Sequence, residues 1–353
     1  MAFLLPFQRA MINLRWRKSN AMTIRTVFEI NNIKPSGFGL SDLAFDPKTG
    51  ALVAVRVSYD EAKRYRRGLI AWEAGTYRQI HYWEDPELSS DHRRNWSELL
   101  FSKNGSRLIA VACSATLCAV FSADDYRFLR EFPICRRQTY VDAPAFSTLE
   151  GEETKLLVPA WNGKLYLCDV DTLNVEEYSG FPNAETIFFA AFSSQNSGKR
   201  WLLGGCNRLE SRDVTTGKTT VWERGDESSP IHCLYLKNEE KIFTLAENGA
   251  TKKASKKIVL RDPTALETLE EYEVKIPGKT NAPELAYSER DNLVAIALNN
   301  GAVLIWDVRT REIYGRIPSV GKNSCVQRLA FSPTASALAV AYGAGLRIRM
   351  LTA

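Results

Sequence analysis

The sequence of 353 residues predicts an all-β fold made of seven similar units, each with four short antiparallel strands. Three observations support this prediction: a short apolar run recurs, a second apolar run follows it after a polar turn, and the copies are evenly spaced. The first runs end at Phe45, Phe101, Phe146, Phe192, Leu236, Tyr287 and Phe331. Successive ends lie 44 to 46 residues apart, except for gaps of 51 and 56. A period of ~40–45 residues with four strands per unit is typical of a β-propeller blade.

The strands inside each unit fit a blade. The first two runs are almost entirely apolar, as in "NLVAIAL" at 292–298. Strands buried on both faces lose the alternation of polar and apolar residues that a half-exposed strand shows. Asn-Gly pairs at 162–163, 248–249 and 300–301 predict tight hairpins between the second and third strands. The fourth run is more polar, as expected for an outer edge.

The last unit has room for only three strands before the sequence ends at Ala353. The alternating segment "TIRTVFEI", residues 23–30, precedes the first complete unit and predicts the missing outer strand. Pairing this strand with the last one would close a ring and remove two free sheet edges. We therefore expect a single propeller domain over residues 23–353, closed by its N-terminal strand.

The first 22 residues differ from the rest of the sequence. They carry four basic residues and no acid, and their apolar part is short, is interrupted by Pro6 and precedes the charges. A secretory signal has the reverse order. We interpret residues 1–22 as an extension, disordered or preceding an alternative start at Met11 or Met22, with a transit peptide as the weaker alternative. No apolar run approaches the ~18 residues of a membrane span.

The repeats resemble those of the WD40-repeat family of seven-bladed β-propellers, over roughly residues 23–353. A complete Trp-Asp pair occurs once, and partial pairs occur in four other units: these are Trp306-Asp307, then Cys168-Asp169, Arg212-Asp213, Arg261-Asp262 and Trp72-Glu73. The Gly-His dipeptide of the family is absent, because the three histidines are His81, His92 and His232. The resemblance implies a ring of seven four-stranded blades, and a related propeller outside the family would give much the same pattern.

Residues suited to catalysis or metal binding do not cluster in the sequence. No two histidines lie at the spacing of metal ligands or of a proton relay. Cys113 and Cys118 bracket one hairpin, and no further zinc ligands lie nearby. The seven cysteines are odd in number and spread along apolar runs, which favours reduced thiols and a cytoplasmic protein. We expect no enzyme, no metal and no cofactor.

Basic residues mark one face of the predicted ring. We label the strands of a blade a to d, and call the side of the d–a and b–c connections the top face and the other side the bottom face. Two long b–c connections and two d–a loops supply the candidate partner-binding residues. These are Lys63, Arg64, Tyr65, Arg66, Arg67, Lys252, Lys253, Lys256 and Lys257, with Arg93, Arg94, Arg136 and Arg137 in the d–a loops. We expect them at exposed loop tips, although charged insertions also occur simply because they stay soluble.

The net charge of +5 allows an acidic partner without requiring nucleic acid. We predict a scaffold that binds an acidic peptide or protein on the top face, as a monomer within a larger complex. The alternative is a phosphate-directed binder of RNA or anionic lipid headgroups, and a propeller hydrolase is the third hypothesis. Tyr65 is the single aromatic residue of the basic loops, whereas single-strand binders interleave several. This difference favours a protein partner.

Overall fold

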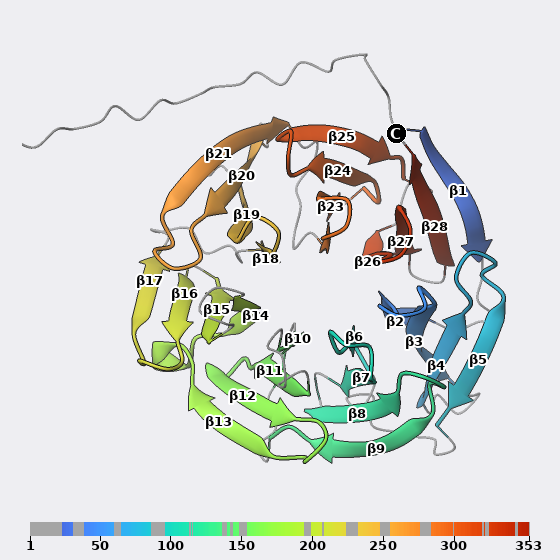
Figure 1. The fold of residues 1–353 in the computed structure, drawn as a ribbon, viewed down its shortest axis with the longest axis horizontal. Helices are drawn as coiled ribbons and strands as arrows, with labels where there is room; N and C mark the ends of the chain where they lie inside the picture. The colour runs from blue at the N-terminus through green and yellow to red at the C-terminus, as the bar shows by residue number, and fades with distance from the viewer. Residues whose placement is uncertain are drawn as a thin grey trace, which may run out of the picture.

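Seven four-stranded antiparallel sheets form a ring in the computed structural model of the protein (Figure 1). The structure describes residues 23–30, 39–59, 65–85, 96–112, 114, 116–135, 140–141, 144–147, 154–193, 199–206, 208–223, 232–247, 255–275, 284–298, 300–319, 321, 325–342 and 345–352. In each sheet strand a lies innermost and strand d outermost. We number the blades in chain order, and the predicted extension at 1–22 lies outside the described residues.

The first four blades follow one another without a crossover. Blade one contains β2 (Gly39–Phe45), β3 (Leu52–Tyr59), β4 (Tyr65–Trp72) and β5 (Gln79–Glu84). Blade two contains β6 (Glu98–Phe101), β7 (Arg107–Ala112), β8 (Leu117–Ser122) and β9 (Phe128–Pro133). Blade three contains β10 (Ala145–Phe146), β11 (Lys155–Pro159), β12 (Lys164–Asp169) and β13 (Val175–Ser179). Blade four contains β14 (Ile187–Ser193), β15 (Arg200–Gly205), β16 (Arg208–Asp213) and β17 (Thr219–Glu223), and the short 3-10 helix η2 (Pro182–Ala184) precedes it.

The remaining three blades complete the ring. Blade five contains β18 (His232–Leu236), β19 (Lys241–Glu247), β20 (Ser255–Arg261) and β21 (Thr268–Lys275). Blade six contains β22 (Leu285–Ser288), β23 (Leu293–Ala297), β24 (Val303–Asp307) and β25 (Glu312–Ile317). Blade seven contains β26 (Val326–Phe331), β27 (Ala337–Tyr342), β28 (Gly345–Thr352) and, from the other end of the sequence, β1 (Thr23–Ile30).

The predicted closure is confirmed. Strand β1 pairs antiparallel with β28, with Thr23 opposite Thr352 and Ile30 opposite Leu346. The two strands lie side by side at the right of the ring in Figure 1. Blade seven therefore combines both ends of the described chain, and its outer strand is covalently linked to blade one rather than to its own third strand.

Buried hydrophobic residues lie between neighbouring blades rather than in one central core. The described residues form seven hydrophobic clusters, one at each blade interface. In β3, Val53 and Val55 pack toward blade two, while Leu52 and Ala54 pack toward blade seven. Both faces of this strand are thus covered, which explains why its sequence is continuously apolar.

The aspartates that end the c strands hold the c–d turns. The Oδ1 atom of Asp307 accepts hydrogen bonds from the backbone N–H groups of Arg309 at 2.7 Å and Thr310 at 3.2 Å. The same two-fold capping recurs at Asp169, Asp213 and Asp262. Because the carboxylate satisfies turn N–H groups that no ladder partner reaches, an aspartate at this position specifies the turn.

The tryptophan of the Trp-Asp pair has a different role, at the interface of two blades. Trp306 is fully buried, and its ring lies 5.5 Å from that of Phe243 and 6.0 Å from that of Tyr272, both in blade five.

The expected Asn-Gly hairpins are confirmed at Gly163 and Gly301, whose φ values are +71° and +77°. The third Asn-Gly pair, at 248–249, lies outside the described residues.

Candidate functional site

Only part of the predicted basic surface lies within the described residues. Lys63, Arg64, Arg93, Arg94, Arg136, Arg137, Lys252 and Lys253 lie outside them, and for Lys256 the structure describes the backbone alone, in β20. Tyr65, Arg66, Arg67 and Lys257 are described, and all four are strand residues at the top ends of β4 and β20. Their partners decide whether these side chains are available to a ligand.

Arg67 does not lie at an exposed loop tip, so the expectation for this residue is wrong. Its side chain is buried, and its guanidinium lies 2.6 Å from the carboxylate of Asp85 and 2.5 Å from that of Glu131. It also lies 4.7 Å from the ring centroid of Trp96. Because β3 and β4 pair as far as Tyr59 and Tyr65, the supposed loop is mostly a strand extension, and Arg67 points into the interface with blade two.

The other described basic residues have acidic neighbours on the adjacent d strand. Nη1 of Arg66 lies 3.0 Å from the carboxylate of Glu84, and Lys257 forms an ion pair with Glu271. Their side chains are about one third exposed. Exposed ion pairs of this kind exchange readily with a ligand, since each is worth only ~0–1 kcal/mol. Arg66 and Lys257 can thus contact a partner on the top face, whereas Arg67 is held inside the ring.

An aromatic surface that the sequence reasoning missed lies on the same face. Tyr140, in the d–a loop before β10, is 48% exposed, and Trp161, in the b–c turn of blade three, is 45% exposed. Their ring centroids are 4.9 Å apart with a tilt of 33°. Phe188 at the start of β14 meets Trp161 edge-on at 6.1 Å. We call Tyr140, Trp161 and Phe188 the aromatic platform. A tryptophan directly before the turn-forming Asn162-Gly163 pair was the available sequence signal.

Backbone contacts hold the aromatic platform in place. The N–H of Trp161 donates to the carbonyl of Tyr140 at 2.9 Å, and the hydroxyl of Thr186 donates to the carbonyl of Trp161 at 3.3 Å. The bridge between Val141 and Ala160 ties the two loops together beside the rings. The platform therefore joins blades three and four and keeps its geometry without a ligand.

The channel wall carries a charged cluster near the top face. The guanidinium of Arg328 on β26 contacts Asp42 of blade one at 3.2 Å, Glu98 of blade two at 2.9 Å and Glu284 of blade six at 3.3 Å. Asp42 also accepts hydrogen bonds from the N–H groups of Leu43 and Leu99. Burial raises the pKa of Asp42 to about 6, and these partners only partly offset the effect.

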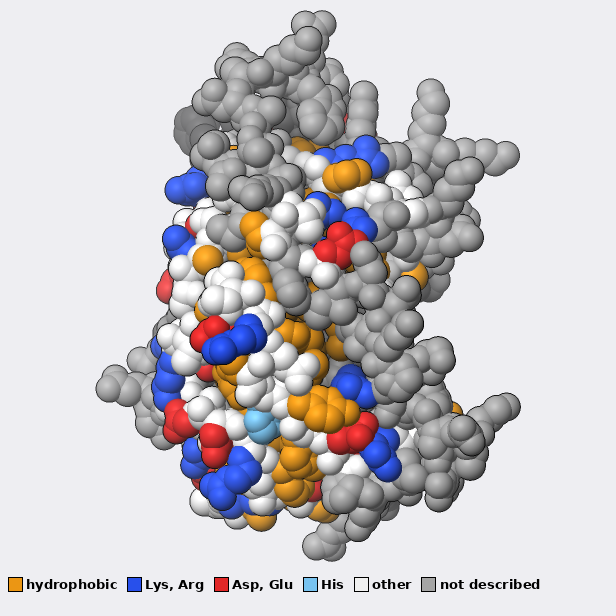
Figure 2. Space-filling view, turned by 90° about the vertical axis from the view of Figure 1, so that its right-hand side faces the viewer, with side chains coloured by type: hydrophobic (Ala, Val, Ile, Leu, Met, Phe, Trp, Pro, Cys, Tyr) orange, Lys and Arg blue, Asp and Glu red, His pale blue; other side chains and the backbone are white. Residues whose placement is uncertain are grey.

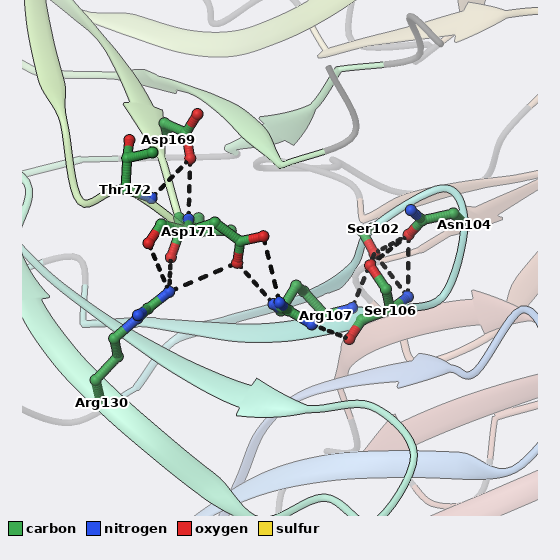
Figure 3. Close-up of polar contacts among 9 residues, drawn as sticks. Ser102, Asn104, Ser106, Arg107, Arg130, Asp169, Asp171 and Thr172 are labelled. Carbon is green, nitrogen blue, oxygen red and sulfur yellow. Dashed lines mark hydrogen bonds and ion pairs between the residues drawn. The ribbon is translucent and has the colours of Figure 1, made fainter. Parts of the chain in front are cut away.

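Polar contacts on the bottom face link blade two to blade three (Figure 3). Arg107, the first residue of β7, binds both carboxylate oxygens of Asp171, at 2.8 and 3.3 Å. Arg130 donates to the backbone carbonyls of Val170 and Asp171 at 2.8 and 2.9 Å. Asp171 lies in the c–d turn of blade three, which Asp169 caps. These polar groups bind one another, which is typical of contacts that hold two blades together.

The outer surface is mixed in character. Figure 2 shows the side formed by blades seven and one, where Lys and Arg side chains are interspersed with Asp and Glu around a band of hydrophobic side chains. Ile80 and Tyr82 of β5 are 46% and 42% exposed there. The described part of this side has no extended surface of one charge, so it gives no reason to expect a phosphate-binding site.

Catalytic groups are scattered in the described part of the chain. No three His, Cys, Asp or Glu residues among the described ones are placed to hold a metal ion. Burial raises the pKa of the thiols of Cys118 and Cys233, which makes them poor nucleophiles. Burial also lowers the pKa of His81 on β5, against the opposing charge of Asp125. Among the described residues, no helix is long and apolar enough to cross a membrane.

Comparison with known proteins agrees with this architecture. A model of the anaphase-promoting complex subunit 4 WD40 domain matches residues 285–353, which contain the strands of blade six and three of the four strands of blade seven. The crystal structure of the RRP9 WD40 repeats superposes with a TM-score of 0.69 at 16% sequence identity, covering 94% of this chain and 99% of that one. The chain is a seven-bladed β-propeller, and the strands of residues 285–353 are similar to those of a WD40 domain. No curated protein matches its sequence. WD40 propellers are in general scaffolds for protein interaction and not enzymes.

Proposed function

We propose that this WD40-like propeller is a non-catalytic scaffold that binds a protein partner on its top face, and that the partner is acidic. The proposal rests on the aromatic platform. Tyr140 and Trp161 are each nearly half exposed, yet their rings pack on one another and their backbones are hydrogen-bonded. Singly exposed hydrophobic side chains are common on protein surfaces, whereas adjoining exposed rings such as these two form a contiguous patch, which more often marks an interaction site.

The energetics of interfaces support this role. Tryptophan and tyrosine are enriched among the few residues that dominate binding energy, because they bury a large area at little cost in conformational entropy. The aromatic platform is already fixed, so a partner does not have to order it. Truncating one such ring typically costs ~2 kcal/mol or more, which is ~30-fold in affinity.

The acidic character of the partner rests on the charge near the platform. Arg136 and Arg137 precede Tyr140 by four and three residues in the sequence. Elsewhere on the top face, Arg66 of blade one and Lys257 of blade five add two further cations, which are paired with acids in weak, partly exposed contacts. Charges around an apolar contact steer an oppositely charged partner and raise its association rate.

The cysteines indicate the cellular compartment of the protein. Among the described residues the cysteines form no disulfide, and Cys118, Cys168 and Cys233 are buried, which favours a reducing compartment. We infer a cytoplasmic protein that acts as a monomer within a larger complex. A scaffold of this kind has no chemistry of its own and contributes through the surfaces that it presents.

Affinity purification tests the proposal. The tagged protein and its Tyr140→Ser, Trp161→Ser double variant are purified with nuclease treatment, and recovered proteins are quantified by mass spectrometry. We expect the double variant to fold like the parent and to lose its main partner at least ~10-fold. Leu269→Ser on β21, which removes a side chain that is 49% exposed on the outer edge, is the matched control and should retain the partner. Equal recovery by the parent and the platform variant refutes the proposal, and recovery that nuclease abolishes points to RNA.

A further inference from the structure

Blade seven contains two buried hydrogen-bond donors that the fold does not use. Tyr342, the last residue of β27, is 7% exposed, and its buried hydroxyl has no hydrogen-bond partner among the described residues. Nε of Arg349 on β28 is likewise buried and without a partner in the described part of the chain. A buried donor that is left unpaired costs free energy, so nearly all such groups bind another polar group, a water or an ion. These two donors therefore mark a place where an acceptor atom would be stabilised.

The register of blade seven brings the two donors to one face of the sheet. Tyr342 pairs with Gly345 across the β27–β28 hairpin, and Arg347 and Arg349 follow Gly345 at alternate positions of β28. Because side chains alternate along a strand, Tyr342, Arg347 and Arg349 share a face. Val340, opposite Arg347, packs on blade six, so this is the face toward blade six. Since Tyr342 ends a b strand, the cluster lies near the top of the interface between blades six and seven.

This cluster has more positive than negative charge. Arg347 forms an ion pair with Glu29 on β1, and Nη1 of Arg349 donates to the hydroxyl of Thr26. Among the described residues, Glu29 is the carboxylate that faces these two guanidiniums, so one positive charge is not compensated. Burial lowers the pKa of Arg349, and the charge of Arg347 adds to this effect, while Tyr342 and Glu29 oppose it. A further anion beside Arg349 would compensate the remaining charge.

The adjoining connections cannot supply that anion. The segments that join β1 to β2, β25 to β26 and β27 to β28 are residues 31–38, 318–325 and 343–344. They connect strand ends on the top face, and they contain Lys34 and Lys322 and no acidic residue. The second carboxylate therefore has to come from a ligand.

The charge and the donors of the cluster fit a carboxylate. One uncompensated positive charge is balanced by the single charge of a carboxylate, whereas a phosphate monoester carries nearly two. The two carboxylate oxygens can accept from a guanidinium and from a tyrosine hydroxyl together. Burial raises the pKa of Tyr342, so its hydroxyl stays protonated and can donate at neutral pH. The side chain of Arg347 is 25% exposed, which gives a ligand access to the cluster from solvent.

We propose that the interface of blades six and seven is a carboxylate-binding site, in which an aspartate or glutamate side chain of the partner binds Arg349 and accepts a hydrogen bond from Tyr342. Arg347 remains paired with Glu29 and adds positive charge beside the ligand. The site opens on the same face as the aromatic platform, but on other blades. The inference takes the acidic protein partner from the proposed function, and it does not depend on the aromatic platform.

Peptide binding tests this site. Fluorescence anisotropy with the full-length protein compares a labelled peptide of alternating Asp, Glu and Gly with the matched peptide of Asn, Gln and Gly. We expect the acidic peptide to bind at least ~10-fold more tightly, because only a carboxylate compensates the charge of Arg349. Equal binding of the two peptides overturns the proposal. Displacement of the acidic peptide by inorganic phosphate more readily than by acetate, at constant ionic strength, overturns it in favour of a phosphate ligand.

Substitutions locate the binding. Tyr342→Phe removes only the hydroxyl and Arg349→Gln removes one charge, and each should weaken the acidic peptide at least ~5-fold. Arg316→Gln, which removes an exposed arginine of β25, is the matched control and should bind like the parent. Without peptide, Tyr342→Phe should be at least as stable as the parent, because it removes a buried hydroxyl that has no partner in the described chain. A hydroxyl with a purely structural role would instead be missed in the melting curve.

The aromatic platform provides the last comparison. In a Trp161→Ser background, Tyr342→Phe should weaken the acidic peptide by the same factor as in the parent, since the two sites lie on different blades. Loss of the cellular partner on changing the platform, with unchanged peptide binding by Tyr342→Phe and Arg349→Gln, refutes this inference and leaves the proposed function standing. Acetate that raises the melting temperature while neither peptide binds would show a site for small carboxylates, and would overturn the assignment to a partner side chain.

Discussion

Arg67 of blade one reaches Glu131 of blade two, with 2.5 Å between Nη1 and Oε1, and so joins two sheets through a charged pair that is largely buried. The same guanidinium binds Asp85 and lies against the ring of Trp96. Similar contacts recur elsewhere in the ring: Arg107 holds Asp171 across blades two and three, and Arg311 holds Glu239 across blades six and five. In a propeller without the histidine network of the WD40 family, arginines therefore supply polar links between blades.

Replacing Arg67 should cost far more than replacing its neighbour. Arg67→Met removes the guanidinium that Asp85 and Glu131 bind, and both carboxylates are less than one fifth exposed. Removing one partner of a buried ion pair typically costs ~3–5 kcal/mol. Arg66→Ser, the matched control, removes a side chain that is 36% exposed, and should cost less than ~1 kcal/mol. Urea denaturation followed by circular dichroism measures both. If the two variants unfold at the same urea concentration, Arg67 contributes nothing beyond a surface charge.

The difference between Arg66 and Arg67 also shows what the sequence could and could not predict. The ring itself was predictable, because the period of the apolar runs and the strand at 23–30 depend on local pattern. The burial of Arg67 was not, because its partner Glu131 is 64 residues away on the next blade. The aromatic platform likewise forms only when the loops of Tyr140 and Trp161 meet. Side chains whose role depends on a neighbouring blade cannot be assigned from the pattern of one blade.

The ionised carboxylate of Glu270 stabilises the folded protein, and acid should remove this contribution by protonating it. Burial alone would raise the pKa of this carboxyl, but hydrogen bonds from Arg311, Lys241 and Tyr272 outweigh it and lower the pKa to about 2 from its usual 4.5. A lowered folded-state pKa stabilises the fold above pH ~4.5, and this contribution is lost as the pH falls toward 2. The gap in unfolding free energy between the parent and Glu270→Gln should therefore narrow from pH 5 to pH 2. A constant gap over that range contradicts the assignment.

Asp42 should have the opposite effect. Its folded-state pKa is raised from 3.8 to about 6, chiefly by burial, so ionisation is harder in the folded protein than in the unfolded chain. Its contribution to stability is present below pH ~4 and is lost as the pH rises to 6. Asp42→Asn should thus gain stability relative to the parent between pH 4 and pH 7, since the amide does not ionise. Thermal unfolding of both proteins at these two pH values checks the sign, with Asp124→Asn, whose carboxylate is 81% exposed, as the control.

Two c–d turns offer a matched test of backbone strain. Leu173 and Gly217 occupy equivalent positions with φ of +63° and +70°. Leu173→Gly should stabilise the protein by up to ~1 kcal/mol, because a side chain at positive φ is strained and Leu173 is 40% exposed. Gly217→Ala should destabilise it by a similar amount, although nothing lies within 4 Å of the added Cβ. If both substitutions change the free energy of unfolding in the same direction, packing rather than φ determines the stability of these turns.

Closure by β1 should control the cooperativity of unfolding. Deleting residues 23–30 together with the preceding extension exposes β28 as a long free edge and removes seven paired positions. We expect aggregation or a large fall in melting temperature. Deleting residues 1–21 alone is the control, and if the extension does not pack on the ring the melting curve should not change. A protein without β1 that remains soluble and as stable as the parent would mean that the ring does not need this strand.

The basic residues of the top face should affect binding and not stability, once Arg67 is left out. Lys63, Arg64 and Arg66 in one connection, with Lys252, Lys253, Lys256 and Lys257 in the other, are changed to Ser. Each exposed charge typically matters by less than ~1 kcal/mol to folding. Removing all of these cations together should lower the affinity for an acidic partner ~10-fold or more, and this decrease should shrink at high salt because the Debye length falls from ~10 Å at 0.1 M to ~3 Å at 1 M.

The control for this experiment must avoid carboxylates that hold the ring together. Glu239 is unsuitable, because it binds Arg311 at 2.7 Å and Lys241 at 3.2 Å. Glu152→Gln and Glu153→Gln, in the predicted a–b turn of blade three, and Asp124→Asn, in the c–d turn of blade two, change acidic residues expected on the bottom face instead. The measurement is titration of the purified partner against the three proteins at two salt concentrations. Because the aromatic platform is retained in all of them, the top-face variant should keep weak, salt-insensitive binding. Loss of binding in the bottom-face variant alone would assign the partner to the other face of the propeller.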